Sequence, residues 1–173
     1  MLWSYLATPR WYSPRWYHEG IAVFMETWMT GGQGRALGAY DEMVFRTMVR
    51  DGARIYSAVG LESEGTAKDF QVGANSYLYG TRFMSYLALE HGPERLLDWV
   101  RRADGTKRYF ASEFERIYGA DLNDEWSRWI EWERAWQAAN LDSIRVNPTT
   151  ECRPLTANAL GSVSRSYIDP RTR

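Results

Sequence analysis

The stretch that decides the fold is PRWYHEGIAVFMETWM, residues 14–29. Bulky apolar side chains recur in it at the spacing of one helix face, namely Trp16, Ile21, Phe24, Met25 and Trp28. Ser13 as the N-cap and Pro14 at the first helical position predict where the helix begins. Gly31 and Gly32 predict where it ends. The stretch therefore predicts an amphipathic helix that covers residues 14–29.

Further helical segments follow along the chain and are separated by glycine-containing breaks. They are expected at residues 41–50, 72–91, 93–103, 107–118 and 123–145. Residues 31–38 and 54–71 carry several glycines and are expected to be irregular. The predicted fold class is all-α, with about six helices in residues 1–146. Residues 147–173 show no periodicity and are expected to be a linker or the start of a following region, which resembles the lead into a β-propeller.

Composition and charge narrow the function classes. The length of 173 residues suits one domain, and a net charge of −1 predicts no general attraction to nucleic acid. No apolar run approaches the ~20 residues that span a bilayer, so no transmembrane segment is predicted. The single cysteine, Cys152, excludes an internal disulfide and a cysteine-rich zinc finger.

Histidine is scarce, which limits the metal chemistry of the chain. The pair His18-Glu19 begins like the zinc motif H-E-x-x-H, in which two imidazoles one helical turn apart hold the metal. Position 22 is alanine, however, so the second imidazole is missing. Catalytic zinc needs three protein ligands, and the segment therefore fails as an H-E-x-x-H site.

A different pattern fits the same residues. Residues 14–26 resemble the second zinc helix of the gluzincin metallopeptidases, which include the thermolysin and aminopeptidase-N families and the peptidase MA-like domains. Their pattern is P-x-W-x-x-E-G-x-A, and its Glu is the third zinc ligand. The resemblance implies that Glu19 is a metal ligand. It also implies that Gly20 and Ala22 are small because this helix packs against the first zinc helix.

A second stretch, residues 75–83, resembles the Y-x-x-G helix start of aminopeptidase-N relatives. In that family a tyrosine well downstream of the ligand Glu stabilises the oxyanion of the tetrahedral intermediate, and Tyr77 follows Glu19 at a similar separation. A phenol suits this role because it donates a hydrogen bond to developing negative charge. The resemblance implies that the chain is the helical C-terminal part of a zincin-like domain.

The chain departs from the family upstream of Glu19. Only positions 1–18 precede it, and the one histidine among them is His18. The resemblance therefore implies an N-terminally truncated fragment that lacks two imidazole ligands and the catalytic base. We expect it to be inactive alone, to retain Zn2+ poorly, and to need the missing N-terminal portion of the same domain. The complete protein would cut a peptide or protein substrate, and we expect it outside the cytoplasm.

Each candidate residue has a plainer alternative. Glu19 could be a solvated helix carboxylate, and Tyr77 could be a core residue. His18 and Glu26 are candidates to support the site, or else surface residues on its helix. Arg82 is a candidate to bind a substrate carboxylate, with a structural ion pair as the alternative. A Glu19 side chain that pointed into solvent, far from Tyr77 and from any cleft, would contradict the peptidase interpretation.

Two other function classes stay open. One is a non-enzymatic helical interaction domain. The other is a glycan-active helical domain, suggested by the aromatic stripe from Trp126 to Trp136. Aromatic stripes at helical spacing usually belong to a core, which favours packing over glycan stacking.

Overall fold

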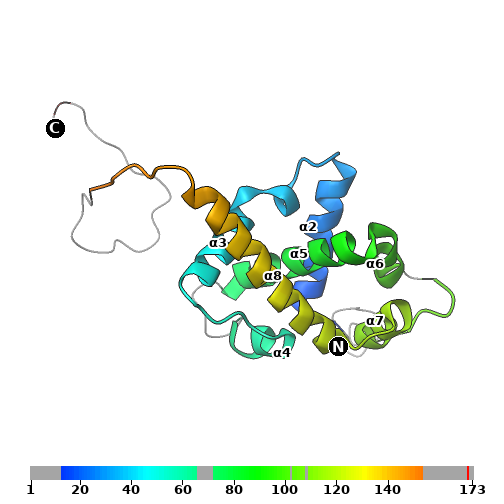
Figure 1. The fold of residues 1–173 in the computed structure, drawn as a ribbon. Helices are drawn as coiled ribbons and strands as arrows, with labels where there is room; N and C mark the ends of the chain where they lie inside the picture. The colour runs from blue at the N-terminus through cyan, green and yellow to red at the C-terminus, as the bar shows by residue number, and fades with distance from the viewer. Residues whose placement is uncertain (1–12, 66–71, 102, 108, 154–170, 172–173) are drawn as a thin grey trace.

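The computed structural model describes residues 13–65, 72–101, 103–107, 109–153 and 171, and its regular structure is helical (Figure 1). The helices are α2 (Arg15–Met29), α3 (Ala39–Arg50), α4 (Ala58–Gly60), α5 (Val72–His91), α6 (Pro93–Val100), α7 (Phe110–Tyr118) and α8 (Leu122–Arg145). A 3-10 turn, η2 (Arg35–Leu37), and a π turn, η3 (Leu61–Gly65), complete them. The described residues contain no strand, which confirms the predicted all-α fold class.

The helix boundaries agree with the prediction most closely where an apolar run is long. Helix α5 covers the predicted residues 72–91, and α8 begins one residue before its predicted start. Helix α6 ends three residues early, and α7 begins three residues late. Residues 147–153 form no helix, and residues 154–170 lie outside the described part of the chain.

The predicted N-cap of α2 was wrong by one residue. Pro14, rather than Ser13, occupies the cap position, and no side chain caps the helix there. The Ser13 hydroxyl instead lies 2.6 Å from His18 Nε2. Proline carries no backbone N–H, so one donor fewer has to be satisfied at this end of the helix.

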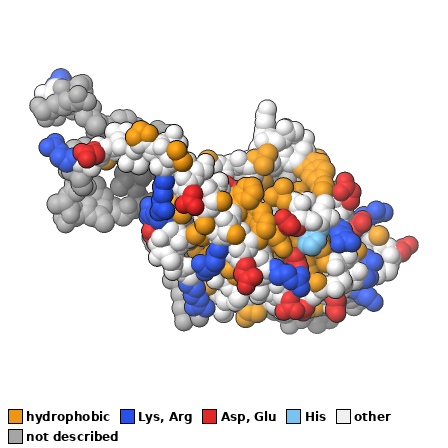
Figure 2. All heavy atoms as spheres, viewed as in Figure 1, with side chains coloured by type: hydrophobic (Ala, Val, Ile, Leu, Met, Phe, Trp, Pro, Cys, Tyr) orange, Lys and Arg blue, Asp and Glu red, His pale blue; other side chains and the backbone are white. Residues whose placement is uncertain are grey.

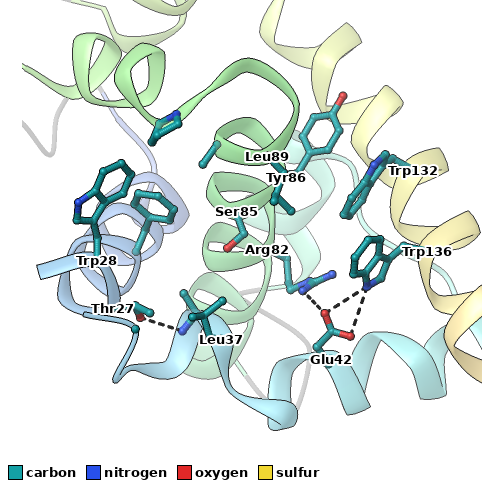
Figure 3. A pocket seen from close by; sticks show the side chains of 15 residues that line it. Thr27, Trp28, Leu37, Glu42, Arg82, Ser85, Tyr86, Leu89, Trp132 and Trp136 are labelled. Carbon is teal, nitrogen blue, oxygen red and sulfur yellow. Dashed lines mark hydrogen bonds and ion pairs between the residues drawn. The ribbon is translucent and has the colours of Figure 1, made fainter. Parts of the chain in front are cut away.

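Helix α5 is the centre of the molecule. It contacts α2, α6 and α8, as well as the turns η2 and η3, while α3 packs on α8 and α7 packs on α6 (Figure 1). In the region of Figure 3, α5 runs between α2 and α8. No helix of the described residues is both long and apolar enough to cross a membrane.

Helices α2 and α5 meet backbone to backbone at Gly20 and Gly80. A Cβ atom added to Gly20 would lie only 2.5 Å from the Gly80 carbonyl carbon. A Cβ added to Gly80 would overlap the Trp16 carbonyl oxygen. Ordinary carbon contacts need about 3.5–4.0 Å, so only glycine at both positions permits this crossing. Gly20 is therefore small because α2 packs against α5 there. Ala22, by contrast, is exposed.

The core beside this crossing is aromatic. The rings of Trp16 and Phe83 each lie with their centroids 4.7 Å from that of Trp126. Trp129 packs edge-to-face on Trp126 at 4.9 Å. Trp126 and Trp129 are fully buried, so this half of the stripe is core, whereas Trp136 at its other end is exposed.

Candidate functional site

Glu19 lies on the second turn of α2, beside the contact with α5. Its side chain is 24% exposed, and Oε1 lies 3.3 Å from Nε of Arg15, one helical turn earlier. The carboxylate is therefore neither buried nor pointing free into solvent. An i,i+4 pair of this kind contributes only about 0.3–0.5 kcal/mol, so another cation could displace the arginine.

Tyr77 lies on α5, close to the same arginine. The guanidinium carbon of Arg15 is 6.0 Å from the centre of the Tyr77 ring, and that of Arg35 on η2 is 5.7 Å from it. Arg35 is held in turn by Asp41, with Nε 3.0 Å from Oδ1. Two cations thus lie against a partly exposed phenol, and each is also paired with a carboxylate, Arg15 with Glu19 and Arg35 with Asp41.

The crossing of α2 and α5 explains why Glu19 and Tyr77 are neighbours of one arginine. Glu19 directly precedes Gly20, and Tyr77 lies almost one turn before Gly80. Because Gly20 and Gly80 touch, the residues next to them on each helix are brought to one place although they are far apart in sequence.

A second carboxyl group, Glu62 of η3, lies on the other side of Arg15. It accepts a hydrogen bond from the backbone N–H of Trp16, in the first turn of α2, and it interacts electrostatically with Arg15. Burial raises the pKa of Glu62 above its usual 4.5, against the opposing effects of Trp16 and Arg15. Arg15 therefore has Glu62, Glu19 and the Tyr77 ring around it.

Two predicted supporting residues, His18 and Glu26, lie elsewhere on α2. His18 is partly exposed, beside Ser13 and the ring of Tyr17, whose centroid is 5.3 Å away. Glu26 is exposed two turns beyond Glu19. The geometry brings neither into the group formed by Glu19, Arg15 and Tyr77, and their supporting roles stay predictions.

Arg82 lies in a buried ion-pair network at the interface of α5, α8 and α3. Its Nε and Nη2 donate to Glu133 of α8 at 3.1 and 2.8 Å, and its Nη1 donates to Glu42 of α3 at 2.6 Å. Gln137 adds a hydrogen bond to Glu133 at 2.8 Å. Arg82 therefore forms a structural ion pair, which was the alternative to its binding a substrate carboxylate.

The described residues do not by themselves form a zinc site. Among the described residues, no group of three His, Cys, Asp or Glu side chains is close enough to hold a metal. Glu19 supplies one carboxylate, whereas zinc needs at least three protein ligands. His91, the histidine far from α2, has its Nε2 2.8 Å from Glu125. Any metal at Glu19 would need ligands from outside the described residues.

A pocket of about 530 Å³ lies farther along the same helices, between α2, α5 and α8 (Figure 3). Turn η2 separates it from Tyr77, since Arg35 lies against the Tyr77 ring whereas Ala36 and Leu37 line the pocket. The Thr27 hydroxyl fixes this turn to α2 by accepting the Ala36 N–H at 3.1 Å. The pocket and the group around Arg15 are therefore separate features.

Sequence reasoning missed Arg15, Arg35 and the pocket. The i,i+4 spacing of Arg15 and Glu19 is a signal that could have identified their pairing. Arg35 lies in a glycine-rich loop whose path no local pattern predicts. Comparison with known proteins adds nothing to these observations: no family model, no curated protein and no solved structure matches the chain.

Proposed function

We propose that this chain is the helical C-terminal part of a gluzincin-type zinc peptidase domain. In this proposal Glu19 is the third metal ligand, and Tyr77 is the hydrogen-bond donor to the oxyanion of the intermediate. One observation carries the proposal: two motifs that lie far apart in the sequence meet at the Gly20–Gly80 contact and share Arg15.

The state of the two side chains is consistent with these roles. The Glu19 carboxylate is partly exposed and is held only by a weak surface-type pair with Arg15. Tyr77 is partly exposed, and two arginines lie against its ring. A carboxylate accessible to a metal and a partly exposed phenol that can donate a hydrogen bond are what acyl-transfer chemistry needs from these residues.

In this proposal the chain is a half-site. The two imidazole ligands and the general base belong to a part of the domain outside this chain. The chain alone is expected to bind Zn2+ weakly and to hydrolyse no peptide bond.

The test uses the protein extended upstream by the in-frame sequence that precedes Met1 in its gene. A calorimetric titration with Zn2+ is expected to show one tight site. Glu19→Gln should abolish stoichiometric binding, because the amide is a far weaker ligand than the carboxylate. Glu131→Gln, an exposed position on α8 that is not a candidate site residue, is the matched control and should bind like the wild type.

A second variant separates the role of Tyr77 from that of Glu19. Tyr77→Phe in the extended protein should keep the zinc stoichiometry and lower kcat for peptide hydrolysis by about 10²–10³, since it removes one oxyanion donor. Loss of zinc binding in Tyr77→Phe would contradict the assigned role. An extended protein that binds no zinc would favour the non-enzymatic helical interaction domain instead.

A further inference from the structure

We propose that the pocket between α2, α5 and α8 binds a small, uncharged aromatic molecule. The proposal goes beyond the peptidase function, because neither Glu19 nor Tyr77 lines this pocket. Its volume of about 530 Å³ lies within the usual range for small-molecule sites, about 300–1,000 Å³. The face on which it opens shows a gathering of hydrophobic side chains (Figure 2).

Aromatic pairs form two walls of the pocket (Figure 3). On α2, Phe24 and Trp28 pack edge-to-face with ring centroids 5.6 Å apart. On α8, Trp132 and Trp136 stack at 5.0 Å with an angle of 14° between their planes. Trp28 is 44% exposed and Trp136 is 43% exposed, so their rings are available to a ligand rather than consumed by the core. Aromatic rings offer stacked and edge-to-face contacts to a planar guest.

The polar atoms of Trp132, Trp136 and Tyr86 are already engaged. Trp132 Nε1 donates to Glu90 at 3.0 Å, and Trp136 Nε1 donates to Glu42 at 3.3 Å. The Tyr86 hydroxyl likewise donates to a buried carboxylate at 2.9 Å, outside the pocket lining. These three rings therefore offer carbon and π surface to a ligand rather than hydrogen bonds.

The charges at the floor of the pocket also cancel. Arg82 is paired with Glu133 and Glu42, and Arg46 lies 4.0 Å from Glu42. Of these side chains Arg82 and Glu42 line the pocket, and their formal charges sum to zero. A charged ligand would lose its hydration here without gaining an unpaired counter-charge, which is unfavourable. The chemistry that matches the site is therefore an uncharged aromatic molecule.

The experiment uses the chain as it is and two probes that differ by one charge. N-phenyl-1-naphthylamine is uncharged, and 8-anilino-1-naphthalenesulfonate carries the same rings with a sulfonate. The fluorescence of the uncharged probe is expected to rise saturably with a stoichiometry of one per chain. The sulfonate should bind about tenfold or more weakly, because the site has no free cation for it.

Two variants place a carboxylate in the pocket, and one control places it beside the pocket. Leu89→Glu and Leu37→Glu alter exposed lining residues, 66% and 75% exposed, so both should fold normally. Each is expected to weaken the uncharged probe about tenfold or more. Met29→Glu, at a 78% exposed position outside the lining, should bind the probe like the wild type.

Three results would overturn the proposal. One is equal binding of the two probes, and another is unchanged binding in both lining variants while circular dichroism shows them folded. The third is a dimer in sedimentation velocity that the lining variants dissociate, since a second copy would then be the occupant. None of these results depends on zinc or on peptide hydrolysis, so they leave the test of Glu19 untouched.

Discussion

Gly20→Ala tests whether the backbone contact of α2 and α5 governs the fold. The new Cβ would lie 2.5 Å from the Gly80 carbonyl carbon, at least about 1 Å inside normal contact distance. The atoms it meets are main chain of a central helix, so no flexible side chain can move aside. The two helices must separate, and the packing of Trp16 on Phe83 separates with them.

The expected magnitude follows from two opposing effects. Overpacking a core costs about 1–3 kcal/mol, and a clash with rigid backbone belongs at the upper end of that range. Replacing a helical glycine by alanine returns about 1 kcal/mol through helix propensity. The free energy of unfolding should therefore fall by about 2 kcal/mol.

Urea unfolding followed by circular dichroism in the far ultraviolet measures this change. Ala22→Gly, two positions along the same helix at an exposed site, is the matched control, and it should lose about 1 kcal/mol through propensity alone. A Gly20→Ala protein more stable than the wild type by about 1 kcal/mol would show propensity without a clash, and the close approach of the helices would be refuted.

Three further predictions concern charged groups. Arg82→Met should destabilise the fold by about 3–5 kcal/mol in urea unfolding, because it leaves the Glu133 carboxylate buried without its cation. The double variant Arg82→Met, Glu133→Leu should recover a large part of the lost stability. If it recovers none, the ion pair is not the cause of the loss. Burial raises the pKa of Glu62 in the native state above its usual 4.5. Its contribution to the free energy of unfolding is therefore fully present below pH 4.5 and is lost as the pH rises through the raised pKa. Glu62→Gln should therefore gain stability relative to the wild type as the pH rises from 4.5 to neutrality, and a pH-independent difference would contradict the shift. Asp121→Ala should cost about 1 kcal/mol, since its side chain accepts the first backbone N–H groups of α8; an unchanged midpoint in thermal unfolding would exclude the cap.

The helices could be predicted from sequence where apolar spacing and a terminating glycine agree. Helix α5 ends before Gly92, whose φ of +87° suits glycine, and the predicted end at residue 91 is confirmed. The predicted start of α7 was wrong because of a contact between the chain before the helix and the first turn of the helix. The backbone N–H of Lys107 donates to the Glu113 carboxylate at 2.8 Å, so the chain turns there before the helix begins. No local pattern around residue 107 carries that contact.

The pocket was beyond sequence reasoning because it depends on three helices at once. Trp28 and Trp136 each belong to a stripe that periodicity assigns to a core. They are exposed because α5 runs between α2 and α8 in this region, and the space between the outer rings of these two helices stays open (Figure 3). The period of one helix says which residues share a face, but not which part of that face a neighbour covers.

The same limit explains what the motif residues could and could not indicate. The sequence pointed to Glu19 and Tyr77 separately, and each is followed by a glycine, at one position in the first case and three in the second. In the structure both glycines allow the same close contact, because a Cβ atom at either position would overlap the backbone of the other helix. A carboxylate and a phenol that are distant in the sequence come to share Arg15 because two backbones touch beside them. The glycines of the two motifs are therefore structural, and they position the two side chains to which the proposed chemistry is assigned.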